Sequence, residues 1–220
     1  MRSLLEEHKV LWSNKVFLIS TLLGVAFFIF SLFFNYFSLN YSIKAVGNST
    51  TDILLDNLPV VNVDMVFSEG ALLFVLFIFA LFLFSPKIIP FTLKSIALFV
   101  CIRATFVAMT HLGIPIDHIK TDFDSLRYVG GAGADQFFSG HTGLPFLMSL
   151  LYWENKTLRW VFFTFSIIAG TAVLLGHLHY TIDVFAAFFI SYTIYHIALK
   201  MFPKDRELFL DGFKNIKLTN

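Results

Sequence analysis

The chain has 220 residues, of which 57% are hydrophobic and only 14% are charged. In water-soluble domains roughly a quarter of the residues are charged, so this composition excludes an ordinary water-soluble domain. It predicts an all-α, polytopic membrane protein. The formal net charge of +1 excludes a surface that binds polyanions by bulk charge, and we therefore expect no nucleic-acid partner. The single cysteine, Cys101, excludes a disulfide framework.

Six apolar segments approach or reach the roughly 17 to 25 residues that a bilayer-spanning helix needs. In chain order, they cover residues 16–38, 67–84, 91–113, 137–153, 160–178 and 181–202. The fourth lies at the lower limit of length. We predict a six-helix membrane domain over residues 16–203, between an N-terminal segment, residues 1–15, and a basic tail, residues 204–220. Residues 4–12 are apolar at helical spacing, which is typical of either an interfacial helix or a solvated one.

Lysine and arginine are distributed unevenly between the two sets of connecting segments. Most of the 16 lysines and arginines, including those near both ends of the chain, flank one side of the predicted bundle. Positive charge is retained on the cytoplasmic side of a membrane, so both termini are predicted to be cytoplasmic. Residues 39–66, residues 114–136 and the turn at His179 then face the opposite, non-cytoplasmic side.

Four ionisable residues fall at membrane depth, namely Arg103, His141, His179 and Asp183. Ionisable groups are energetically unfavourable in a bilayer, so each of the four is a functional candidate. They come from three different predicted spans. The predicted orientation nevertheless gathers all four at the outer side of the bundle.

The spacing of His179 and Asp183 indicates a catalytic pair. The two residues are four apart, which places them on one face of a helix. The carboxylate can then hold one imidazole nitrogen, fix the tautomer and direct the other nitrogen at a substrate. In a second span, His141 is placed to supply or remove a proton.

The segment Ser139-Gly140-His141-Thr142 has the features of a phosphate site. It combines a glycine that permits close approach with two hydroxyls at a predicted helix N-terminus. Free backbone N–H groups and the helix dipole favour an anion at such a position. Pro145 is tolerated in the first turn, where N–H groups lack helical partners.

The remaining histidines are weaker candidates. We expect His118 and His196 to be hydrogen-bonded structural residues, whereas His111 and His177, near the predicted outer surface, are somewhat stronger candidates. Residues two apart on a helix point to different faces, so His177 and His179 do not suggest a metal site.

Two sequence blocks resemble the type 2 phosphatidic acid phosphatase superfamily and, within it, most closely the sphingomyelin synthase branch. Residues 135–142, DQFFSGHT, resemble that branch's D-x-x-x-S-G-H-T block, and residues 176–184, GHLHYTIDV, resemble its A-H-x-H-Y-T-x-D-V block. A weaker similarity places Arg103, Thr110 and Pro115 on its third-span motif. The resemblance covers under half of the chain.

The chain departs from the wider superfamily at the residues that grip phosphate. It lacks the K-x6-R-P block, and Ala172 and Val173 precede His179 where an S-R-x5-H-x3-D block has serine and arginine. A phosphomonoester carries up to two charges and rewards a basic clamp, whereas a phosphodiester carries one. The departure therefore favours a phosphodiester lipid. It leaves open whether water or a lipid alcohol is the acceptor.

The resemblance implies an enzyme that cleaves a glycerophospholipid phosphodiester and releases diacylglycerol. In this scheme His179, held by Asp183, attacks phosphorus and forms a phosphohistidine, while His141 protonates the departing oxygen. The acceptor is ceramide, diacylglycerol or water, so the enzyme is either a head-group phosphotransferase or a phospholipase C-type hydrolase of the bilayer. The resemblance implies no cofactor, and we expect no metal.

The predicted site has three catalytic residues, His141, His179 and Asp183. Its predicted substrate-binding residues are Arg103, Asp135, Ser139, Gly140, Thr142 and Tyr180. Asp122 or Asp124 is expected to contact a cationic head group. Two alternatives stay open, a lipid phosphomonoesterase with a different clamp and a non-catalytic lipid transporter, although the internal repeats typical of transporters are not visible.

Overall fold

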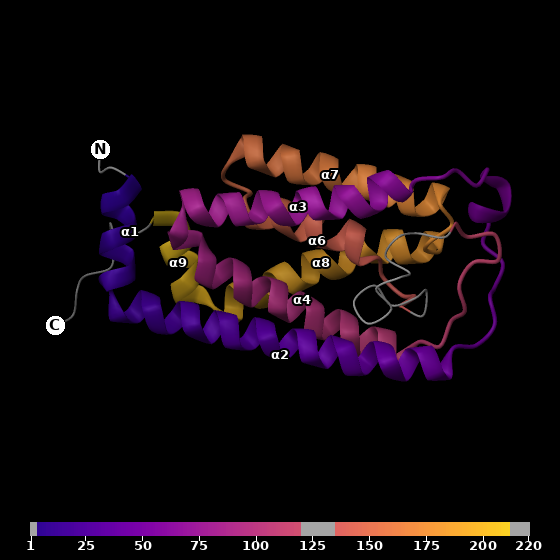
Figure 1. Cartoon of the computed structure of the whole chain (residues 1–220), viewed down its shortest axis with the longest axis horizontal. Coiled ribbons are helices and arrows are strands. Elements are labelled where there is room, and N and C mark those ends of the chain that lie inside the picture. The colour runs from indigo at the N-terminus through magenta and orange to yellow at the C-terminus, as the bar shows by residue number, and fades with distance from the viewer. Residues whose placement is uncertain (1–3, 120–134, 212–220) are drawn as a thin grey trace.

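The computed structural model describes residues 4–119 and 135–211, and all regular secondary structure in these two ranges is helical. The long helices run along one axis, and α1 and α9 lie at the same end of the bundle (Figure 1). The α-helices are α1 Leu4–Ser13, α2 Lys15–Ala45, α3 Asp64–Phe84, α4 Ile89–Met109, α6 Gly140–Leu151, α7 Lys156–Leu175, α8 Thr181–Met201 and α9 Pro203–Asp211. Two short 3-10 helices, η1 Leu55–Asn57 and η2 Pro86–Ile88, lie in the connections.

Five helices in the described ranges are long and apolar enough to cross a membrane, namely α2, α3, α4 together with η2, α7 and α8. This confirms the predicted all-α, polytopic membrane fold. The predicted fourth span, residues 137–153, is helical only over the 12 residues of α6. At about 1.5 Å per residue, α6 is roughly 18 Å long and covers only part of a hydrocarbon core of about 30 Å. In the described ranges, the six predicted spans therefore correspond to five helices long and apolar enough to cross a membrane and one short helix, α6.

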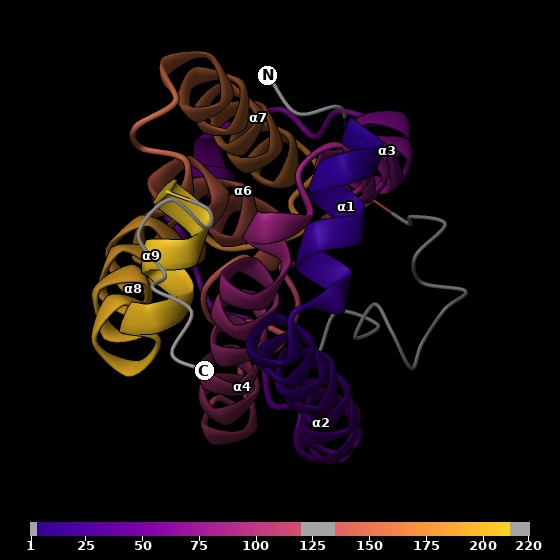
Figure 2. The same cartoon turned by 90° about the vertical axis from the view of Figure 1, so that its left-hand side faces the viewer.

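The short helix α6 lies in the middle of the bundle. It packs mainly against α7 and α8, while α2 packs along α4, as the view down the bundle shows (Figure 2). In the most apolar stretch of η2 and α4, 56% of the residues are buried inside the protein, against 11% in that of α3. The helix α4 is thus a central element, and α3 turns most of its surface outward.

Aromatic side chains fill the interior between these helices. Phe99 meets the ring of Phe138 edge-on at 5.4 Å, and Phe74 meets Phe162 edge-on at 5.9 Å. Edge-on and tilted pairs stabilise by electrostatic complementarity of the rings beyond their buried area. The many phenylalanines therefore serve packing inside the bundle as well as the outer surface.

The N-terminal helix α1 lies across the end of the bundle (Figure 1). Its Leu11 is buried against Phe17 and Leu208, and Trp12 packs edge-on against Phe17. On its exposed side, α1 carries Leu5. The interfacial helix and the solvated helix both stay predictions.

The predicted tail contains a helix. Most of α9, Pro203–Asp211, lies within residues 204–220 and packs back on the bundle through the buried Leu208 and Phe209. The remainder of the tail, including Lys214 and Lys217, lies outside the described residues.

Candidate active site

Two hydrogen bonds join the sequence blocks that the motifs single out. The backbone N–H of Ser139 donates to the carbonyl of Asp183 at 3.0 Å. The side-chain amide of Gln136 donates to the carbonyl of Leu178 at 3.3 Å. These bonds fix the start of α6 to the start of α8. The predicted catalytic residues therefore gather at the end of the bundle opposite α1 and α9.

The predicted pair of His179 and Asp183 is present. Nδ1 of His179 lies 3.2 Å from Oδ2 of Asp183, and the same oxygen accepts the backbone N–H of Tyr180 at 3.2 Å. Asp183 is fully buried, and His179 is 3% exposed. A carboxylate on Nδ1 leaves Nε2 as the nitrogen available for chemistry.

The expected reason for this pairing is wrong, because His179 does not lie on a helix. The helix α8 begins at Thr181 with Tyr180 as its N-cap, so His179 belongs to the turn before it. Asp183 is the third residue of α8, and its carboxylate reaches back over the start of the helix. The two residues meet through helix-capping geometry and not through a shared helix face.

The chain reaches His179 through a tight C-terminal motif on α7. The N–H of Leu178 donates to the carbonyl of Val173 at 2.8 Å, and the N–H of His177 donates to that of Leu174 at 3.0 Å. His177 adopts a left-handed conformation, with φ of 52°. This bond pattern is a Schellman motif, which reverses the chain within a few residues. The next residues are therefore delivered directly to the start of α8.

The entry into α6 contains strained backbone. Phe137 and Phe138 have φ values of 85° and 33°, which are rare for residues other than glycine. Strain of this kind persists only where packing imposes it, and Phe138 is fully buried between the rings of Phe99 and Phe106. The carbonyl of Phe138 consequently faces Nε of Arg103, which donates to it at 3.3 Å.

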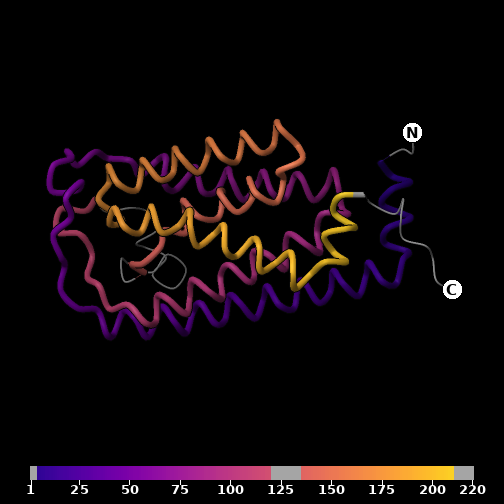
Figure 3. Tube along the Cα trace, turned by 180° about the vertical axis from the view of Figure 1, so that it is seen from behind, coloured from indigo at the N-terminus to yellow at the C-terminus, as the bar shows by residue number. Residues whose placement is uncertain are grey.

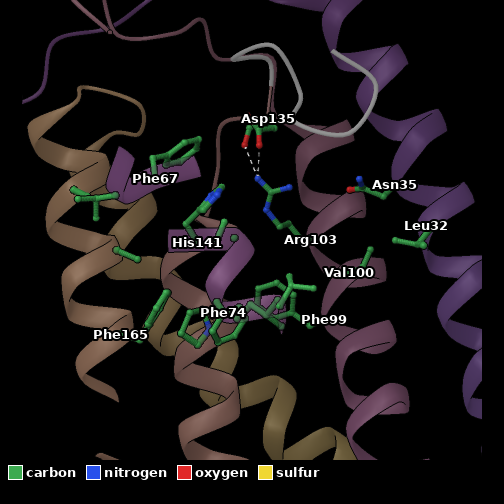
Figure 4. A pocket seen from close by; sticks show the side chains of 18 residues that line it. Leu32, Asn35, Phe67, Phe74, Phe99, Val100, Arg103, Asp135, His141 and Phe165 are labelled. Atoms are coloured by element: carbon green, nitrogen blue, oxygen red, sulfur yellow. Dashed lines mark hydrogen bonds and ion pairs between the residues drawn. The ribbon is translucent and has the colours of Figure 1, made fainter. Parts of the chain in front are cut away.

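Arg103 forms an ion pair with Asp135. One terminal guanidinium nitrogen, Nη2, lies 2.7 Å from Oδ2 of Asp135 and also donates to its backbone carbonyl at 3.2 Å (Figure 4). Burial raises the pKa of Asp135, but the charges of Arg103, His179 and His141 outweigh it and hold that pKa below its ordinary value. Asp135 is therefore ionised at neutral pH, and it orients the guanidinium.

A pocket of about 280 Å³ begins at these groups. Arg103, Asp135 and His141 lie at one end of it, together with Asn35 of α2 (Figure 4). The ring of Phe67 lies 3.9 Å from that of His141, centroid to centroid. Most of the remaining lining is apolar and comes from α2, α3, α4, α6 and α7, and includes Leu32, Phe74, Val75, Val100, Leu144 and Phe165.

Gly140 allows Arg103 to pass beside α6. A Cβ atom on this residue would lie 3.1 Å from Nε of Arg103. We expect Gly140→Ala to displace the guanidinium by a few tenths of an ångström and to lower lipid turnover by about tenfold, because small displacements in a site are strongly amplified in rate. Initial rates in bilayers test this. Gly70→Ala is the control, since its Cβ would meet only Phe165 at an ordinary 3.9 Å, and an equal loss of rate in both would contradict the prediction.

Three predicted substrate-binding residues are not among the described residues that line the pocket. The hydroxyl of Ser139 accepts the N–H of Thr142 and caps α6, and Thr142 is buried beside Gly170 of α7. The hydroxyl of Tyr180 donates to the carbonyl of Gly113 at 2.9 Å. Their contacts with substrate stay predictions. His179 likewise does not appear in the described lining.

The structure places the four remaining histidines of the described ranges that were weighed as candidates in different surroundings. Nδ1 of His118 lies 2.9 Å from the carbonyl of Pro115, and the ring of His196 packs against Tyr192. His111 is exposed beside a tyrosine ring. His177 is buried, and its Nε2 has no hydrogen-bond partner among the described residues. Asp122 and Asp124 lie outside the described residues.

Sequence reasoning missed three contributors to this region. Phe67 is one of 29 phenylalanines, and Asn35 lies in a long apolar segment, so no motif marks either. Asp52, in the connection after α2, contacts the first residue of α8. The one sequence signal for Asp52 is that it lies in residues 39–66, which are predicted to face the same side as the site.

Residues 133–200 match the family model described as PAP2 superfamily C-terminal. The matched segment holds α6, α7 and α8, with Asp135, His141, His179 and Asp183, and covers under half of the chain. The match supports the PAP2 superfamily, whose members are phosphatases and phosphotransferases, and so supports an enzyme. No curated protein and no solved structure matches the chain.

Proposed function

We propose that the protein is a membrane phosphotransferase that cleaves the phosphodiester of a glycerophospholipid and releases diacylglycerol. The observation that carries this proposal is the pocket in which Arg103 and His141 stand at one end of a largely apolar lining. A phospholipid has the matching arrangement, with a charged phosphate at one end and apolar acyl chains at the other. The match to the PAP2 superfamily supports the same class of chemistry.

In the first step, His179 is the nucleophile. Its Nε2 attacks phosphorus, and the bond between phosphorus and the glycerol oxygen breaks. His141, protonated at the start, transfers its proton to that oxygen, so neutral diacylglycerol leaves. Asp183 on Nδ1 stabilises the positive charge that develops on the ring of His179.

In the second step, the head group moves to an acceptor. His141, now neutral, removes the proton from a hydroxyl group, whose oxygen attacks phosphorus as the phosphorus–nitrogen bond breaks. The acceptor is ceramide, diacylglycerol or water. A guanidinium has five N–H donors, so Arg103 retains donors for the equatorial oxygens while it is paired with Asp135.

The charge of the pocket supports a diester over a monoester. Among the described residues of its lining, Arg103 is the one permanent cation, and Asp135 already neutralises it. A phosphodiester brings a single negative charge to this site, whereas a phosphomonoester brings up to two. A lipid phosphomonoesterase is the second candidate, because the family match covers phosphatases as well.

Product analysis by mass spectrometry tests the proposal directly. Purified protein is incubated with mixed phospholipid bilayers, with and without ceramide. We expect diacylglycerol with a new phosphosphingolipid when ceramide is present, or diacylglycerol with a free phosphorylated head group when water is the acceptor. Inorganic phosphate from phosphatidic acid alone would establish the phosphomonoesterase instead. Unchanged lipids in every mixture would refute both.

The proposal also places the site on the non-cytoplasmic side. Ile116 is 80% exposed and lies at the site end of the bundle, whereas Lys204 is exposed at the opposite end. In a Cys101→Ala background, we expect Ile116→Cys to react with a membrane-impermeant thiol reagent on intact cells. Lys204→Cys should react only after permeabilisation, and the reverse pattern would invert the topology.

A further inference from the structure

The connection between α2 and α3 reaches across the outer end of the bundle to the start of α8 (Figure 3). There, Asp52 accepts two hydrogen bonds from Thr181. The backbone N–H of Thr181 donates to Oδ2 at 2.6 Å, and its hydroxyl donates to Oδ1 at 2.6 Å. Both carboxylate oxygens of Asp52 therefore accept hydrogen bonds from Thr181, which stands two positions after His179.

The carboxylate of Asp52 is itself held in place. Its Oδ1 accepts the N–H groups of Leu54 at 2.9 Å and Leu55 at 3.2 Å. Its own N–H donates to Oδ2 of Asp56 at 3.2 Å. Burial raises the pKa of Asp52, but the hydrogen bonds from Thr181 and from these amides outweigh it and lower the pKa below its ordinary value. Asp52 is thus an ionised acceptor at neutral pH.

Two carboxylates hold successive amides in the turn that carries His179. Asp183 accepts the N–H of Tyr180, and Asp52 accepts the N–H of Thr181. These are among the first amides of α8, where the helix dipole favours negative charge. Asp183 reaches them from within the helix, whereas Asp52 reaches them from a segment 129 residues away.

A second anchor ties the same turn to the outer connections. Tyr180 is 2% exposed, and its hydroxyl accepts the N–H of Thr50 at 3.1 Å while donating to the carbonyl of Gly113. The two outer connections are joined to one another as well, because the N–H of Gly113 donates to the carbonyl of Asn48 at 3.1 Å. The two outer connections therefore help to set the position of the turn, in addition to α7 and α8.

We propose that Asp52 is a positioning residue for His179, which it holds through Thr181. Asp183 fixes the orientation of the imidazole, and Asp52 fixes the position of the turn on which the imidazole stands. This inference rests on the proposed function, in which His179 is the nucleophile. It assigns a role in catalysis to a segment outside the matched residues 133–200.

Asp52→Asn separates this role from simple loop packing. Asparagine has nearly the same shape and retains one acceptor oxygen, which suffices to accept from Leu54 and Leu55. With that oxygen kept at the place of Oδ1, the NH2 group replaces Oδ2 and faces the N–H of Thr181, from which it cannot accept. The substitution thus removes the bond from the backbone N–H of Thr181 and leaves the bond from its hydroxyl and the local loop bonds intact.

The experiment measures kcat and KM for lipid turnover by the full-length protein in bilayers. We expect Asp52→Asn to lower kcat by roughly tenfold to a hundredfold, because a displaced reacting group is strongly penalised in rate, with KM within about twofold. Thr181→Val, which removes only the hydroxyl bond, should lower kcat less. The double variant, which removes both bonds between residue 52 and residue 181, should lower kcat more than either single variant. Asp117→Asn is the control, because it removes an exposed carboxylate from the neighbouring outer connection.

The outcomes distinguish a failure of the positioning role of Asp52 from a failure of the proposed function. Unchanged kcat in Asp52→Asn would overturn the positioning role, as would a loss explained wholly by a smaller folded fraction, measured by thermal unfolding. If the unaltered protein turns over lipid but His179→Ala does so equally well, the assignment of the nucleophile fails instead. Absence of turnover by the unaltered protein would overturn the proposed function and, with it, this inference.

Discussion

His179→Ala is expected to lower kcat for diacylglycerol release by at least about a thousandfold, because no group remains to form the covalent intermediate. The side chain is 3% exposed, contacts Asp183 through Nδ1 and lies in the turn before α8, so its removal leaves a small polar gap without breaking a helix. Folded protein should therefore still be recovered. Initial rates in phospholipid bilayers, corrected for the folded fraction, give the result.

The control for this prediction is a histidine inside α8, the helix that follows the turn of His179. His196 lies in α8 beside Tyr192, away from the described lining of the pocket, and His196→Ala should leave turnover within about twofold. Full activity in His179→Ala would refute the catalytic assignment. Asp183→Asn refines the test, because it should lower the rate with little change in lipid binding; unchanged turnover would count against its orienting role.

Periodicity and charge predicted the long helices well because these properties are local. The predicted spans 16–38, 67–84, 91–113, 160–178 and 181–202 correspond to α2, α3, α4, α7 and α8. The ends differ by a few residues, except that α2 continues to Ala45. Apolar composition cannot mark such an end, since polar side chains near a membrane surface are compatible with helix as well as with loop.

The short α6 was less accessible to prediction. An apolar run including Phe137 and Phe138 is typical of a helix, yet both residues take positive φ values, so α6 begins only at Gly140. The reason is tertiary, because Phe138 is buried between rings of α4, and Arg103 of α4 holds its carbonyl. Backbone strain imposed by distant packing has no local signature in the sequence.

The candidate site shows the same division between local and distant causes. Spacing alone predicted that His179 meets Asp183, although the capping geometry that brings them together was not foreseen. The pairing of Arg103 with Asp135 spans 32 residues, and that of Asp52 with Thr181 spans 129. Contacts of this kind depend on how helices and connections are placed, which composition and periodicity do not encode.

The opposite end of the bundle, which the distribution of lysine and arginine predicts to be cytoplasmic, holds a buried ion pair. Nζ of Lys94 in α4 lies 2.6 Å from Oδ2 of Asp205 in α9, and the two side chains are 11% and 12% exposed. Ser20 of α2 completes the cluster. Its hydroxyl accepts from Lys94 at 2.7 Å and donates to Asp205. Three helices are thus joined at one point.

Asp205→Asn is expected to lower the free energy of unfolding by about 3–5 kcal/mol, because removing one partner leaves Lys94 as an uncompensated buried charge. Reversible unfolding in mixed detergent micelles measures the change. Lys94→Met combined with Asp205→Leu should recover most of the loss, since apolar residues of similar size need no counter-charge. Lys204→Met, at an exposed neighbouring position, should stay within about 0.5 kcal/mol of the unaltered protein.

The position of this ion pair also predicts what its loss leaves intact. Lys94 and Asp205 lie at the end of the bundle that carries α1 and α9, away from the pocket lined by His141 and Arg103. Turnover per folded molecule should therefore be unchanged in Asp205→Asn at temperatures where it remains folded. An equal deficit in the single and double variants would mean that the cluster acts by shape and not by charge. A fall in turnover per folded molecule would instead reveal coupling along α4, the helix that carries both Lys94 and Arg103.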